Sequence, residues 1–114
     1  MAPDDLDTHL RSLGLDVELI SDPKNNTYTA ARNVTIPTGS LAGRVCDVAL
    51  QRLPAVPYQV PAAIHIRPIL VPMGTVGTQA SDLGSDWQYW SRRLDRPPTP
   101  QVVWAHVLTV LGEV

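Results

Sequence analysis

Eleven of the 114 residues are proline, and this limits what the chain can fold into. Proline has a fixed φ angle and no backbone N–H, so it interrupts helices and occurs in strands only at their edges and ends. Its share here is about twice the average of about 5%. We therefore expect many extended and turn segments, and several strand edges that cannot pair with a further strand.

Helix signals occur near each end of the chain. Residues 2–15 have a proline and two aspartates in the expected first turn and a glycine, Gly14, as the stop signal, with one apolar face formed by Leu6, Leu10 and Leu13. Residues 99–114 begin with Thr99 as the N-cap and Pro100 at the first helical position. The apolar stripe of this segment predicts a core helix: Val103, Trp104, Val107, Val110 and Leu111.

Four segments between these helices alternate apolar and polar residues, as half-buried strands do: 15–21, 27–37, 44–53 and 62–70. In the second segment, one face is predicted to hold Tyr28, Ala30, Val34 and Ile36. In the fourth, Ile64 and Ile66 should face inward, and His65 and Arg67 outward. A helix followed by four successive strands predicts an antiparallel meander in an α+β domain.

Residues 71–85 contain three glycines and small polar residues, and we expect them to form a long irregular flap. Loops of this length are unusual in a compact domain and often carry function. The chain is short enough to form one domain over residues 1–114, and its composition, 44% apolar and 18% charged, fits a globular protein.

Charge and cysteine content exclude several classes of protein. The net charge of −2, without a basic run, argues against nucleic acid as a steady partner. A single cysteine, Cys46, excludes an intrachain disulfide and a cysteine-cluster metal site. No apolar run approaches the length of a membrane span and no signal peptide is evident, so we expect a cytoplasmic protein without a membrane partner.

The segment "DWQYWSRRLDRPPTP", residues 86–100, crowds two of the three tryptophans and three arginines beside a run of prolines. Together with "VPYQVPAAIHI" and "LDRPPTPQVVWAHVLTVL", and with the order of predicted elements, it resembles the ubiquitin-conjugating enzyme family. In that family a proline-rich segment leads into the fourth strand, and a Trp-Ser-Pro tripeptide opens the next helix. The "W-x-x-W-S-R" spacing is most similar to the bacterial branch called prokaryotic family E, which occurs with multi-ubiquitin-like proteins.

This resemblance implies a UBC-like fold: an N-terminal helix packed on a four-stranded antiparallel meander, with a long flap and the closing helix on the same side. It also implies a ubiquitin-like conjugation pathway in bacteria. The partners would be a ubiquitin-like protein, an activating-enzyme-like protein and a metallopeptidase of the same operon, with a role in defence against phage.

The chain departs from the family at the catalytic position. When Thr99 and Pro100 are set on the family's Ser-Pro, Trp90 falls where the catalytic cysteine belongs. The family's His-Pro-Asn tripeptide is absent, and its positions fall on residues 80–82. The family's thioester chemistry therefore does not carry over to Trp90, which has no nucleophilic atom.

Other residues could supply a nucleophile. Ser91 could accept an acyl group as an oxyester if a base removed its proton. Asp82 and Asp86 are nearer to it along the chain than the histidines His65 and His106, which could approach only through the fold. The alternative is that Ser91 hydrogen-bonds a turn. Cys46 is the only thiol, but its place in an alternating strand is better explained as a small buried hydrophobe.

The same segment offers residue types that bind partners. Tryptophan and tyrosine are enriched in binding hot spots, and arginine binds carboxylates, so the candidate partner-binding residues are Trp87, Tyr89, Trp90, Arg92, Arg93 and Arg96. The alternatives are aromatic rings that cover a helix end and a solvated basic turn. We expect at least one ring in the core and at least one in a surface groove. The three histidines lie far apart in sequence, so we expect no metal site and no cofactor.

Three hypotheses for function remain open. The first is a conjugating-type protein in which the catalytic cysteine is atypical or absent. The second is a non-catalytic interaction module like the RWD-type relatives of the same fold. The third is an unrelated small-molecule hydrolase that uses a serine or a carboxylate in the flap, and a deep pocket on which titratable groups converge would favour it.

Overall fold

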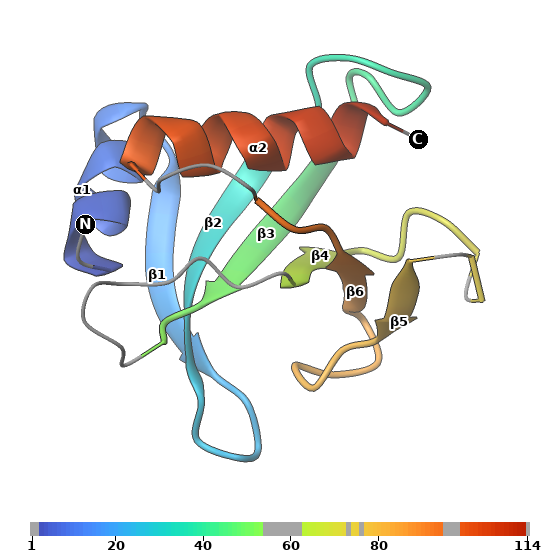
Figure 1. Cartoon of the computed structure of the whole chain (residues 1–114), viewed down its shortest axis with the longest axis horizontal. Coiled ribbons are helices and arrows are strands. Elements are labelled where there is room, and N and C mark those ends of the chain that lie inside the picture. Colours follow the sequence, from blue (N-terminus) through green and yellow to red (C-terminus); the bar gives the residue numbers. More distant parts are fainter. Residues whose placement is uncertain (1–2, 54–62, 73, 76, 95–98, 114) are drawn as a thin grey trace.

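The computed structural model describes residues 3–53, 63–72, 74–75, 77–94 and 99–113. It is an α+β fold in which helix α1 (Pro3–Ser12) precedes a sheet of six strands and helix α2 (Pro100–Gly112) follows it (Figure 1). The strands are β1 (Asp16–Ser21), β2 (Thr27–Thr35), β3 (Val45–Gln51), β4 (Ala63–Arg67), β5 (Thr78–Ala80) and β6 (Gln88–Ser91). Within the described residues, neither helix is long and apolar enough to cross a membrane.

All neighbouring strands are antiparallel, in the order β1-β2-β3-β4-β6-β5. The predicted meander is present as β1 to β4, but the sheet has six strands instead of four. Strand β5 lies inside the segment 71–85, which was expected to be irregular, and β6 lies inside the aromatic segment 86–100. Both are at most four residues long, too short for an alternating pattern to stand out from the loops around them.

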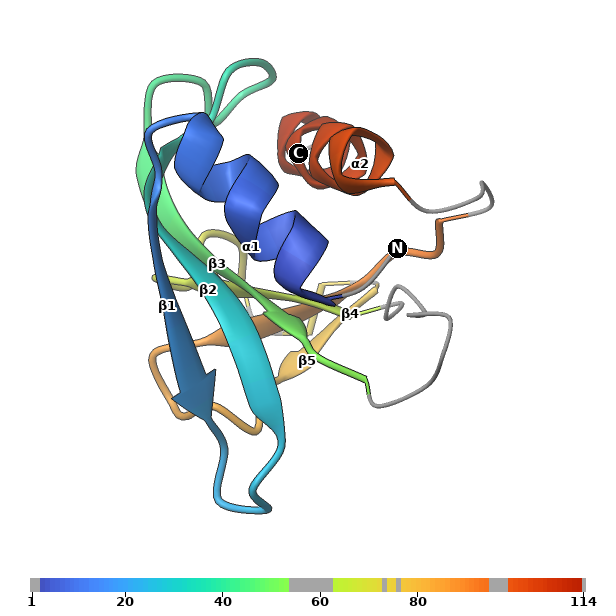
Figure 2. The same cartoon turned by 90° about the vertical axis from the view of Figure 1, so that its left-hand side faces the viewer.

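Both helices pack on one face of the sheet (Figure 2). We call the buried residues between the helices and this face the helix-side core. Its largest side chains that are less than 2% exposed are those of Trp90, Leu6, Leu10, Ile36, Ile64, Ile66, Leu111, Val48, Val103 and Val107, and Trp104 also belongs to it. The closing helix is confirmed, with Thr99 as its N-cap and Pro100 at its start. Leu13 was wrongly assigned to the apolar face and is 52% exposed, because α1 ends at Ser12 and the chain then turns away at Gly14 (φ 82°).

The opposite face of the sheet has a smaller core of its own, which we call the loop-side core. It consists of Tyr28, Ala30, Ala49 and Trp87, with Ile20 and Leu83 packed against it. Leu83 and Trp87 belong to the connection between β5 and β6. The expectation that the whole flap lies on the same side as α2 is therefore wrong, since this connection covers the far face of the sheet.

A bulge in β2 moves side chains between the two cores. The register with β3 shifts between Ala31 and Val34, and Asn33 within the bulge has a φ of 56°. Its N–H donates to the Asp47 carboxylate over 3.0 Å. Tyr28 consequently faces the loop-side core whereas Val34 faces the helix-side core. The prediction that these residues share one face of β2 was wrong, because an alternating pattern in the sequence does not reveal the extra residue of a bulge.

An ion-pair network joins α1 to the sheet. Asp7 is buried and accepts a hydrogen bond from the Thr29 hydroxyl over 2.6 Å and an ion pair from Arg52. The other guanidinium nitrogen of Arg52 contacts Asp4 at 2.6 Å. A buried carboxylate needs both a cation and hydrogen bonds to offset its lost hydration.

We expect Arg52→Met to lower the free energy of unfolding by about 3 kcal/mol, because Asp7 would stay buried without its cation. The matched control is Arg32→Met, which breaks the Arg32–Glu18 pair, whose side chains are 40% and 45% exposed. That change should cost less than about 1 kcal/mol. Urea unfolding measures both, and equal losses would contradict this role of Asp7.

Candidate functional site

The aromatic segment forms strand β6, and its side chains alternate between the two cores. Gln88 and Trp90 point into the helix-side core, while Trp87 and Tyr89 point to the loop side. Trp90 is 1% exposed and its indole N–H donates to Gln88 Oε1 over 2.9 Å. Gln88 in turn donates to the Val71 carbonyl over 3.0 Å. Trp90, which the resemblance aligns with the catalytic cysteine of the family, is thus a buried and hydrogen-bonded core residue.

The two candidate nucleophiles lie in different environments. Cys46 is 2% exposed, and burial, with a smaller contribution from Asp47, raises the pKa of its thiol to about 11. Ser91 is exposed at the end of β6, where its N–H donates to the Gly77 carbonyl over 2.7 Å. In the described part of the chain its hydroxyl has no hydrogen bond to a histidine or a carboxylate, so no base is in contact with it.

The candidate carboxylates, Asp82 and Asp86, lie near the start of β6, at the opposite end of this strand from Ser91. Antiparallel pairing sets Ala80 opposite Gln88 and Thr78 opposite Trp90. Asp82 and Asp86 therefore follow the end of β5 that is next to the start of β6, whereas Ser91 ends β6. The structure does not bring these carboxylates to Ser91.

Arg92 and Arg93 directly follow the end of β6. Arg92 contacts Glu113 at 3.1 Å and donates to the Ser91 carbonyl over 2.8 Å. Its guanidinium lies directly against Gly77, where an added Cβ would come within 2.5 Å of Arg92 Nη1. Arg93 is exposed, and Arg96 lies outside the described residues.

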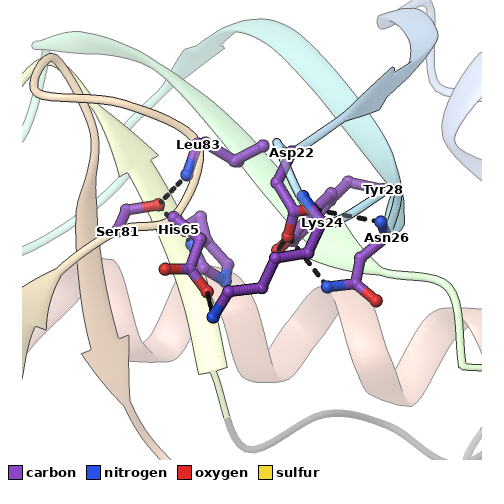
Figure 3. A network of polar contacts seen from close by, with 8 residues as sticks. Asp22, Lys24, Asn26, Tyr28, His65, Ser81 and Leu83 are labelled. Atoms are coloured by element: carbon purple, nitrogen blue, oxygen red, sulfur yellow. Dashed lines mark hydrogen bonds and ion pairs between the residues drawn. The ribbon is translucent and has the colours of Figure 1, made fainter.

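A polar cluster around His65 of β4, on the loop side of the sheet, was not predicted from the sequence (Figure 3). His65 was predicted to face outward, and it does leave the helix-side core, but it is only 4% exposed because the chain after β5 covers it. Its Nδ1 lies 2.7 Å from the Ser81 hydroxyl, which also accepts from the Leu83 N–H over 3.1 Å. The signal available in the sequence was an alternating strand position occupied by histidine, which does not reveal a covering loop.

Two tyrosines enclose the imidazole. The ring centroids of Tyr28 and Tyr89 lie 5.1 Å and 5.3 Å from that of His65, both edge to face. Burial lowers the pKa of His65, although Asp82 and Asp22 oppose the shift. The imidazole is therefore neutral at pH 7, so one of its nitrogens donates a hydrogen bond and the other accepts one.

Asp22 anchors the turn between β1 and β2 under this cluster. Its carboxylate accepts from the N–H groups of Lys24 and Asn26, from the Asn26 amide and, over 2.8 Å, from the Tyr28 hydroxyl. Burial by itself would raise the pKa of Asp22, but these hydrogen bonds favour the charged form and lower the pKa to about 2.

The surface is hollowed beside the cluster. A pocket of about 340 Å³ is lined by Asn26, Tyr28, Gln51, Ala63, His65, Gln79, Ala80, Asp82 and Tyr89, and we call it the His65 pocket. A second hollow of about 370 Å³ lies on the outer side of α2, lined by Gln101, Val102, Ala105, His106 and Thr109. Among the described residues, no three histidine, cysteine or acidic side chains converge as metal ligands would.

No family model matches the chain, and no curated protein or solved structure matches it. The resemblance to conjugating enzymes therefore rests on the order of the elements and on the sequence motifs. Parts of two of these motifs, residues 54–62 and 95–98, lie outside the described residues. The family remains a prediction.

The hydrogen bonds to Asp22 should make stability depend on pH. Because its folded pKa of about 2 lies below the ordinary value of 3.8, the carboxylate stabilises the fold above about pH 4 and loses this effect as the pH falls toward 2. We expect the difference in unfolding free energy between wild type and Asp22→Asn to be constant above about pH 5 and to shrink below about pH 4. Urea titrations at each pH measure it, and a constant difference down to about pH 2 would contradict the assignment.

Proposed function

We propose that this chain is a non-catalytic interaction module of the conjugating-enzyme type, and that it binds a ubiquitin-like protein in a conjugation pathway. The observation that carries the proposal is the burial of Trp90 at the position where the resemblance puts the catalytic cysteine. A cysteine that takes up a ubiquitin-like chain has to be reached by the activating enzyme. A side chain enclosed under α2 serves packing instead.

The remaining nucleophiles also support a role without covalent chemistry. The Cys46 thiol is buried and, with a pKa of about 11, protonated at neutral pH. The Ser91 hydroxyl is exposed, and no base among the described residues is in contact with it, although a serine nucleophile requires one. Binding a partner requires neither group.

The surface next to the end of β6 suits such a partner. Helix α2 contains no Asp, Glu, Lys or Arg, so its outer side presents an uncharged hollow. His106 lines this hollow, and its Nε2 lies 3.4 Å from the Arg92 carbonyl oxygen, so the backbone of the Arg92–Arg93 pair passes beside the hollow. Arginine forks bind carboxylates, including the C-terminal carboxylate of a ubiquitin-like tail. An uncharged centre with a charged rim is the usual anatomy of a protein interface.

A binding and charging experiment tests the proposal. The protein is mixed with ATP, an activating enzyme and the ubiquitin-like protein that this enzyme charges, taken from genes beside its own where those genes encode them. Its intact mass is read with and without reductant. We expect no covalent adduct under either condition and a non-covalent complex by calorimetry. Arg93→Glu should weaken this complex at least about ten-fold, whereas Arg11→Glu, the same charge change on α1, should leave it unchanged.

Either of two results would overturn this proposal. An adduct that resists reductant and disappears in Ser91→Ala would show oxyester transfer at Ser91. Absence of a complex, with an activating enzyme shown to charge its own cysteine, would remove the ubiquitin-like protein as the partner.

A further inference from the structure

We propose that the His65 pocket binds a primary ammonium group, independently of the interaction proposed for α2 and β6. The pocket lies on the loop side of the sheet, whereas α2 covers the other face. Three features point to this ligand: the negative charge of the pocket, the His65 Nε2, which makes no hydrogen bond to the described residues, and the Lys24 ammonium beside Asp82.

The charge of the pocket favours a cation. Asp82 contributes a carboxylate to its lining, and Asp22 lies beneath, with its negative charge held by hydrogen bonds. Both carboxylates act electrostatically on His65. Among the described lining residues there is no lysine or arginine, so an anion would meet repulsion here and a cation attraction.

The imidazole supplies a directed contact. His65 is 4% exposed and lines the pocket, and its Nδ1 is held by Ser81. Within the described part of the chain, Nε2 makes no hydrogen bond. The Ser81 hydroxyl has two lone pairs and can accept from both the Leu83 N–H and Nδ1–H. In that tautomer the neutral ring presents the Nε2 lone pair to a donor in the pocket.

Lys24 already places an ammonium beside Asp82, one of the residues that line the pocket. Its Nζ lies 3.6 Å from Asp82 Oδ2, and the two side chains are 73% and 57% exposed. Figure 3 shows the Lys24 side chain extended across the cluster toward the side of His65. An exposed pair of this kind contributes little stability, so a ligand ammonium can displace Lys24 at small cost.

The rest of the lining suits an organic ammonium better than a metal ion. The rings of Tyr28 and Tyr89 flank the imidazole, and aromatic rings attract a nearby cation. Among the described residues no group of three metal-binding side chains forms. A primary ammonium instead has three N–H donors, enough for the Asp82 carboxylate and His65 Nε2 together.

Amide NMR spectra of the full chain, titrated with n-butylammonium chloride at constant ionic strength, test the inference. We expect saturable shifts at His65, Tyr89 and residues 79–82, with a dissociation constant on the order of millimolar for so small a ligand. Butyltrimethylammonium keeps the charge but has no N–H donor, so it should bind at least about ten-fold more weakly.

Variants separate the pocket from general charge effects. Lys24→Met removes the competing ammonium and should tighten binding by about two- to five-fold. Asp82→Asn should weaken it at least about ten-fold. The matched control, Glu18→Gln, removes a carboxylate from the same side of the sheet outside the pocket and should leave binding unchanged.

Equal shifts with both cations, or no saturable shift even in Lys24→Met, would overturn the inference. Nα-acetyl-lysine methylamide distinguishes two sources of the ammonium. Binding as strong as that of n-butylammonium would indicate a lysine side chain of a partner protein. Binding of n-butylammonium without binding of Nα-acetyl-lysine methylamide would indicate a small-molecule amine.

Discussion

The structure depends on the alternation of side chains along β6. Successive residues of a strand face opposite sides of a sheet. Gln88 and Trp90 are therefore buried on the helix side, while Tyr89 and Trp87, which directly precedes β6, lie on the loop side. Trp90, pointing toward α2, joins the helix-side core. Trp87 and Tyr89, pointing away, draw the preceding loop over the far face and bury His65 beneath it.

This arrangement gives the two faces of the sheet different chemistry. On the helix side, the large side chains are packed and the thiol of Cys46 stays protonated, which supports a binding role over acyl transfer. On the loop side, the imidazole of His65, two tyrosines and the Asp82 carboxylate line a pocket, and Asp22 accepts a hydrogen bond from one of these tyrosines. The two proposals therefore concern separate surfaces, and the failure of one leaves the other standing.

The sequence predicted the elements whose patterns are long and regular. Both helices and the β1 to β4 meander follow from apolar periodicity, caps and turn residues. It did not predict β5 and β6, because strands of three or four residues carry too little pattern, nor the β2 bulge, where one inserted residue at Asn33 exchanges the faces. The burial of His65 depends on a loop that is distant in sequence, so no local pattern contains it. The sequence singled out Asp82 as a candidate base, but its neighbours in the pocket come from four other segments of the chain.

The most direct test of this account is native-state hydrogen exchange of the Trp90 indole N–H and of the backbone amides of β6. If β6 is a core strand, the indole hydrogen that bonds Gln88 exchanges only through global unfolding. Its free energy of exchange should then equal the unfolding free energy from urea titration. Exchange as fast as that of the exposed turn 38–43 would show that β6 opens locally while the rest of the protein stays folded. This result would contradict the two-sided core on which both proposals depend.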